Sequence, residues 1–149
     1  MSLFFRIWRT FARYHPSLPI GYILNKASYK KLSPEVLKAY SAPFPDRKHK
    51  GGAVAFPLLV PANKNDPAVQ HIQKARNVLS KWSKPALVMF SDKDKVLGGL
   101  EKFFYRLVPS SREQKKIKIK DAGHFLQEEK GEEIAQYIHK FIKDELRVK

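Results

Sequence analysis

Two short apolar segments in the second half of the chain constrain its fold more than any other feature. Residues 86–90 form a continuous apolar run between breakers, as is typical of a strand covered on both faces of a parallel sheet. Residues 115–120 alternate, with Ile117 and Ile119 on one face and lysines on the other, and predict a half-buried strand. Helical patterns lie between these segments and after them, so we expect an α/β fold with parallel neighbouring strands.

Amphipathic spacing and cap signals predict helices along much of the remaining chain. Ser33-Pro34 and Asp66-Pro67 each combine a capping side chain with proline at the first helical position. We expect helices over residues 2–14, from Pro34 to Tyr40, from residue 52 to about Val60, from residue 67 through Trp82, from Leu100 to Leu107, and after Gln127.

Acidic side chains follow the first predicted strand, and a histidine follows the second. Asp92 and Asp94 come after residues 86–90, whereas His124 comes after the turn that ends the alternating segment. The carboxyl ends of neighbouring parallel strands lie at one edge of a sheet, so an acid and the imidazole can meet there. A carboxylate bonded to histidine fixes its tautomer and stabilises the imidazolium, as in a catalytic triad. The alternative for a lone histidine is a packing or capping role in a loop.

The third member of such a triad is missing from the sequence. There is no Gly-x-Ser-x-Gly elbow and no cysteine, so the candidate acid and base have no evident nucleophile. The lack of cysteine also excludes disulfides and suits a reducing cytoplasm, which is the expected location. No apolar run approaches the length of a membrane span, and the first nine residues make a poor signal peptide.

The chain of 149 residues carries a formal net charge of +15. Clustered Lys and Arg attract nucleic acids, but here short basic groups are spread among ordinary globular sequence, without a nucleic-acid-binding motif. We therefore expect solvated basic faces and no specific nucleic-acid partner. No membrane partner is expected either.

Four stretches, taken in order, closely resemble the haloalkane dehalogenases of the α/β-hydrolase superfamily. They are residues 32–46, 55–61, 90–98 and 121–128, the last reading Asp-Ala-Gly-His-Phe-Leu-Gln-Glu. The resemblance covers nearly all of this chain but only the second half of the family's domain. It implies a partial α/β-hydrolase fold, with a helical cap segment followed by the last two parallel strands and their helices. Residues 1–80 would form the cap and return helix, and residues 81–149 the C-terminal part of the core.

The resemblance also implies roles for individual residues. In this family an aspartate displaces halide from an sp³ carbon to give an alkyl-enzyme ester, and a histidine activates water to hydrolyse it. His124 matches that base and Asp94 matches its supporting acid, with Asp92 as the rival. Trp8 resembles the cap tryptophan whose indole N–H holds the halide.

Further positions match the family's small hydrophobic pocket, although core packing is an equal alternative for each of them. They are Phe5, Phe56, Pro57, Val60, Val96, Leu97 and Phe125. The resemblance implies a small halogenated alkane as substrate and halide as product, with no metal and no organic cofactor.

Because the resemblance begins at the cap, the nucleophile and the early strands are expected to be absent from this chain. We therefore expect a fragment, a truncated gene product or one half of a split enzyme. It would be inactive alone and would work with a complementing N-terminal half or self-associate. Two alternatives are an epoxide hydrolase or other α/β-hydrolase fragment, and a non-enzymatic basic interaction module whose binding salt would abolish.

Overall fold

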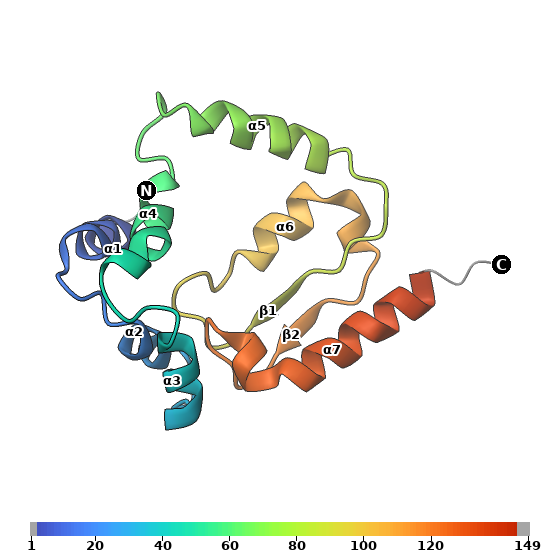
Figure 1. Cartoon of the computed structure of the whole chain (residues 1–149). Coiled ribbons are helices and arrows are strands. Elements are labelled where there is room, and N and C mark those ends of the chain that lie inside the picture. Colours follow the sequence, from blue (N-terminus) through green and yellow to red (C-terminus); the bar gives the residue numbers. More distant parts are fainter. Residues whose placement is uncertain (1–2, 146–149) are drawn as a thin grey trace. The chain divides into compact units, whose positions relative to one another are not determined.

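The computed structural model describes residues 3–145, which form helices and two short parallel strands (Figure 1). In chain order the elements are α1 (Leu3–Tyr14), α2 (Ile20–Ala27), α3 (Pro34–Ser41), η1 (Lys48–Lys50), α4 (Gly51–Leu59), α5 (Ala68–Leu79), β1 (Met89–Ser91), α6 (Glu101–Leu107), η2 (Pro109–Arg112), β2 (Ile117–Ile119) and α7 (Leu126–Glu145). The chain divides into two compact units. Unit 1 takes the chain up to Ile23 and then Ser33–Ala75, whereas unit 2 takes Leu24–Leu32 and the chain from Arg76 onward.

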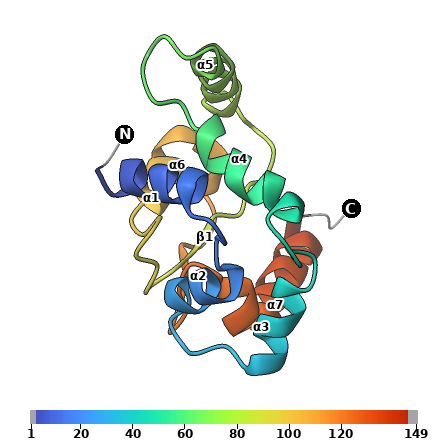
Figure 2. The ribbon, with the colours of Figure 1, turned by 60° about the vertical axis from the view of Figure 1, so that its left-hand side comes forward.

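In unit 1, α1 packs against α4, and the two helices lie side by side in both views (Figures 1 and 2). The Arg47 guanidinium donates to the carbonyl oxygens of Arg13 and Pro16, both at 3.1 Å, at the carboxyl end of α1. The Arg9 guanidinium reaches the Val60 carbonyl at 2.9 Å, just past the end of α4. Arg47, part of a basic group in the sequence, therefore caps the carboxyl end of α1, and Arg9 joins α1 to the end of α4.

The Ser33-Pro34 cap signal in unit 1 works as the sequence predicts, whereas α5 begins at Ala68, one residue after Pro67. The Ser33 hydroxyl accepts the Val36 N–H at 3.3 Å and Pro34 occupies the first helical position of α3. The predicted helix over residues 52–60 is α4, which ends at Leu59 because Val60 is extended.

Unit 2 contains the sheet. β1 and β2 pair in parallel, with Met89 opposite Ile117 and Ser91 opposite Ile119. Figure 1 shows α6, which connects the strands, on one side of this pair and α7 on the other. Ile119 is fully buried and Lys118 is exposed, so the predicted alternation of β2 is confirmed. The predicted order of strand, helix, strand and helix is confirmed as well.

Three local expectations are corrected. β1 spans only Met89–Ser91, because its partner β2 is three residues long, and residues 86–90 are half-buried rather than fully covered. α5 ends at Leu79 and not at Trp82, because the amides of Lys81 and Trp82 turn back to carbonyls only three residues earlier. α2 has no counterpart among the predicted helices.

No helix in the described part of the chain is both long and apolar enough to cross a membrane.

Candidate active site

Asp94 sits in the tight turn that follows β1, and this turn directs its carboxylate. Oδ1 accepts the amides of Val96 at 2.7 Å and Leu97 at 3.0 Å. A Cβ on Gly98 would lie 2.3 Å from the Asp94 carbonyl oxygen, so the turn needs glycine there. With Oδ1 held by backbone, Oδ2 is left to face the end of the neighbouring strand.

His124 meets that second oxygen. Its Nδ1 lies 3.1 Å from Asp94 Oδ2, and the two side chains are 28% and 6% exposed. The ring packs edge-on against Phe125, with ring centroids 5.2 Å apart. The strands β1 and β2 are parallel, so their carboxyl ends bring the acid and the imidazole to one edge, as the sequence predicts.

The pKa of Asp94 lies below its ordinary value. Burial is the largest single influence and acts to raise this pKa. The hydrogen bonds from the Leu97 amide, His124 and the Val96 amide, together with the charge of His124, outweigh burial and lower the pKa. Asp94 is therefore an ionised acceptor at neutral pH, able to orient the imidazole and to stabilise an imidazolium.

Asp92, the rival acid, has different surroundings. Its Oδ2 lies 3.5 Å from Lys93 Nζ, and its side chain is 15% exposed. Burial tends to raise the pKa of Asp92, but the charge of Lys93 and the amides of Ala122 and Asp121 bring it below the ordinary value. Its buried Oδ1 has no hydrogen-bond partner among the described residues. The imidazole thus faces Asp94 and not Asp92.

The loop that carries His124 is held by the backbone on several sides. Asp121 adopts a left-handed conformation (φ 54°), which turns the chain after β2. The Ser91 hydroxyl, at the end of β1, donates to the Gly123 carbonyl at 2.7 Å, and both groups are buried. The amide of His124 donates to the Ala27 carbonyl at 2.8 Å. The position of His124 therefore depends on both strands and on a segment nearly 100 residues upstream.

Trp8 and four predicted pocket residues belong to unit 1. Trp8 is half-buried on α1 and stacks on Phe11, with ring centroids 5.7 Å apart. Phe5 lies one turn earlier on α1, and Phe56, Pro57 and Val60 lie on α4 or at its end. A surface hollow of about 360 Å³ in this unit is lined by Arg6, Ile7, Thr10 and Phe11 instead.

The other three predicted pocket residues lie beside Asp94 and His124. Val96 and Leu97 follow Asp94 in its turn and are partly exposed, whereas Phe125 contacts the His124 ring. The proposed roles of all these residues in substrate binding stay predictions. Among residues 3–145 no group of three His, Asp or Glu side chains is arranged to hold a metal ion.

Sequence reasoning missed two residues that shape this site. Ser91 ends an apolar strand and carries no catalytic signature, and Glu129 lies in the first turn of α7 among other acidic residues. The Glu129 carboxylate accepts the Gly123 amide at 2.6 Å. The Ser91 contact joins residues 32 apart, which no local pattern shows. The Glu129 contact spans six residues at the start of α7, where an acidic residue is common and does not by itself indicate which amide it accepts.

The chain is similar to curated haloalkane dehalogenases. It is 41% identical over 143 residues to the enzyme from Psychrobacter cryohalolentis, a match that covers 96% of this chain and 47% of that protein. It is 41% identical over 134 residues to the enzyme from Mycobacterium marinum, covering 90% of this chain and 45% of that protein. The chain thus spans about half the length of the curated relatives it matches. No protein-family model matches it.

Solved structures of haloalkane dehalogenases match the fold of this chain. The haloalkane dehalogenase DpaA from Paraglaciecola agarilytica NO2, described as tetrameric, matches with a TM-score of 0.76 and 27% identity, over 92% of this chain and 46% of that one. DatA from Agrobacterium tumefaciens C58 matches with a TM-score of 0.74 and 21% identity, over 97% and 52%. The prediction of a partial α/β-hydrolase fold is confirmed.

Proposed function

This chain corresponds in sequence and fold to the C-terminal portion of the haloalkane dehalogenases, and we propose that it supplies the base, the supporting acid and the cap of such an enzyme. The observation that carries this proposal is the contact of 3.1 Å between His124 Nδ1 and Asp94 Oδ2 at the carboxyl ends of two parallel strands. These residues are the ones that match the family's base and acid.

The proposed reaction takes place in two steps. An aspartate on the complementing portion of the fold attacks the sp³ carbon, so a carbon–oxygen bond forms while the carbon–halogen bond breaks and halide leaves. His124 then takes a proton from water, and the resulting hydroxide attacks the ester carbonyl carbon. Collapse of that intermediate releases the alcohol and restores the carboxylate, while Asp94 stabilises the imidazolium. The net change converts haloalkane and water into alcohol, halide and a proton.

The finer assignments rest on the resemblance. The Trp8 indole N–H would hold the departing halide, and the predicted pocket residues would exclude water from the alkyl group. Residues 1–80 would serve as the cap and return helix and residues 81–149 as the core. The partners would be a small halogenated alkane, halide and the N-terminal portion of the fold, in the cytoplasm.

A complementation experiment tests this function. The chain is co-expressed with the part of the Psychrobacter cryohalolentis enzyme that it does not match, and halide and alcohol are measured after a 1-bromoalkane is added. Both products should appear in equal amounts. Asp94→Asn should slow alcohol release by about a hundredfold or more, because the imidazole loses its orienting charge.

Asp92→Asn is the matched control, since it makes the same change two residues away. Alcohol release with this variant should stay close to that of the unsubstituted chain. If Asp92→Asn abolishes turnover and Asp94→Asn does not, the acid has been assigned to the wrong residue. A complex that forms but releases no halide contradicts the proposed function.

A further inference from the structure

The carboxylate of Glu129 accepts hydrogen bonds from three backbone amides of unit 2. Oε2 accepts the amide of Gly123 at 2.6 Å and that of Tyr29 at 3.1 Å, and Oε1 accepts the amide of Lys30 at 2.6 Å. Two of these donors lie about 100 residues away in sequence, whereas the third immediately precedes His124. Both oxygens of one carboxylate thus join an upstream segment to the loop of the proposed base.

The surrounding backbone leaves little room for that loop to move. A Cβ on Gly123 would lie 2.6 Å from the Ala27 carbonyl oxygen and 2.6 Å from the Tyr29 nitrogen. The amide of His124 also donates to that Ala27 carbonyl, at 2.8 Å. The hydrogen bonds to the Glu129 carboxylate and the hydrogen bond from the His124 amide to the Ala27 carbonyl therefore join the same two backbone segments, residues 27–30 and residues 123–124.

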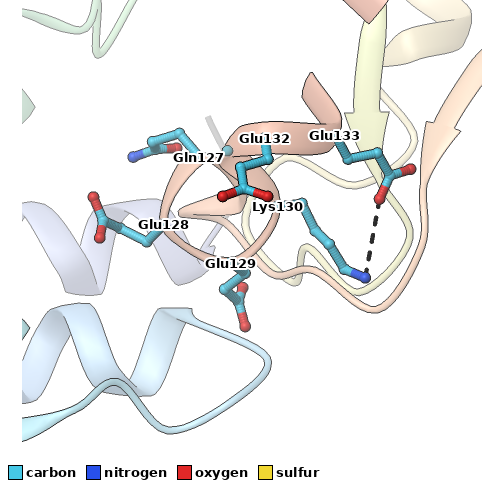
Figure 3. Close-up of a pocket in the computed structure, with 7 residues that line it drawn as sticks. Gln127, Glu128, Glu129, Lys130, Glu132 and Glu133 are labelled. Carbon is cyan, nitrogen blue, oxygen red and sulfur yellow. Dashed lines mark ion pairs between the residues drawn. The ribbon is translucent and has the colours of Figure 1, made fainter. Parts of the chain in front are cut away.

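A break in α7 follows Glu129 directly. Lys130 has non-helical angles (φ −142°, ψ 32°), so the first turn of α7 is separated from the rest of the helix. Figure 3 shows Glu129 directed away from Glu133, whose carboxylate pairs with Lys130 at 3.9 Å. Glu128, Glu129, Glu132 and Glu133 all line a surface hollow of about 450 Å³. The Glu129 carboxylate reaches the His124 loop at the Gly123 amide.

Carboxylate acceptors bind backbone amides more strongly than neutral acceptors do. If the carboxylate were lost, the three amides would need new partners, and Gly123 is buried where water has little access. A loop freed in this way would no longer hold the imidazole at a fixed distance from Asp94.

We propose that Glu129 is a positioning residue for His124: its carboxylate fixes the Gly123–His124 backbone against residues 27–30 and so maintains the contact between His124 and Asp94. The description of His124 as a base rests on the proposed function. The contact between His124 and Asp94 that Glu129 maintains does not rest on the proposed function, and it can be measured in the chain alone.

The test uses the full chain labelled with ¹⁵N and ¹³C. Long-range NMR couplings should connect the amides of Gly123, Tyr29 and Lys30 to the Glu129 carboxyl carbon. In Glu129→Gln, hydrogen exchange at these three amides should accelerate at least about tenfold. The ring ¹⁵N shifts of His124 should also move toward an average of its two tautomers, because the orientation toward Asp94 is lost.

Glu132→Gln is the matched control, since it removes the same charge from the exposed face of the same helix. It should leave both readouts unchanged. Equal exchange rates and His124 shifts in the two variants overturn the proposal. Should Glu129→Gln fail to fold, the couplings in the unsubstituted chain decide, and their absence overturns it.

The NMR result for Glu129 does not depend on whether the complemented chain turns over a haloalkane. If the NMR couplings are intact but the complemented chain gives no dehalogenation, Glu129 remains a positioning residue and the proposed function is rejected. Full turnover by Glu129→Gln together with unchanged His124 shifts would reject the positioning role and keep the function.

Discussion

The two oxygens of the Asp94 carboxylate have different partners. Oδ1 accepts two amides of its own turn, and Oδ2 faces His124. Asp92, two residues earlier, has no such turn and pairs with Lys93. Local backbone geometry thus decides which of two neighbouring aspartates can orient the histidine, because the turn aims one carboxylate at the end of β2.

This arrangement predicts a pH-dependent contribution of Asp94 to stability. Its pKa in the folded chain lies below the ordinary value of 3.8, so the unfolded chain binds more protons between the two values. The contribution is therefore complete above the ordinary value and is lost as the pH falls through the folded value. Asp94→Asn should lower the free energy of unfolding by about 1–3 kcal/mol at pH 7 and by less at pH 3.

Urea denaturation from pH 3 to pH 7 measures this difference. Asp144→Asn, at an exposed position of α7, is the control and should change stability little at any pH. A stability difference for Asp94→Asn that grows as the pH falls is incompatible with the depressed pKa.

At the scale of elements, the loop between β2 and α7 depends on a glycine without a side chain at position 123. Gly123→Ala should cost about 1–3 kcal/mol, because its Cβ would press on backbone atoms of residues 27–29, which cannot rotate away. Gly131→Ala is the matched control, since nothing lies within 4 Å of its Cβ and it stands within α7. It should stabilise the chain by about 0.5–1 kcal/mol.

Thermal or chemical denaturation of both glycine variants provides the comparison. If Gly123→Ala proves as harmless as Gly131→Ala, the close approach between the His124 loop and residues 27–29 does not exist in solution.

Several elements follow from sequence because their signals are local. The alternation of Ile117 and Ile119 gives β2, and a capping serine before Pro34 gives α3. The meeting of His124 with an acidic side chain also follows, because parallel strands joined by a helix end at one edge, whereas the choice of Asp94 over Asp92 came from the family resemblance. Such predictions need only periodicity, capping and sheet geometry.

Other features could not be predicted, for physical reasons. α2 has no clear start signal, because it opens where the carbonyl of Pro19, a residue that often breaks helices, accepts the Ile23 amide. The contact of residues 27–30 with the His124 loop spans about 100 residues and depends on backbone amides, which every sequence has. Glu129 likewise looks like an ordinary acidic residue at a helix start.

At the scale of the whole molecule, the chain exposes surfaces that suit a further partner. Unit 1 exposes large apolar side chains on α1 and α4, including Phe4, Ile7, Phe56 and Leu59. In unit 2, β1 pairs with β2 on one edge and has no other strand partner among residues 3–145. Since the chain spans about half of its curated relatives, these surfaces support the proposal of a complementing portion of the fold.

Intact mass spectrometry of the complemented protein tests the central claim most directly. The chain with His124→Ala is combined with the unmatched portion of the Psychrobacter cryohalolentis enzyme and exposed to a 1-bromoalkane. We predict that the complementing portion gains the mass of one alkyl group and keeps it, because no base hydrolyses the ester. With His124 present, the ester should turn over to alcohol. Alcohol released at an undiminished rate by the His124→Ala complex, with no alkylated species, would contradict the account.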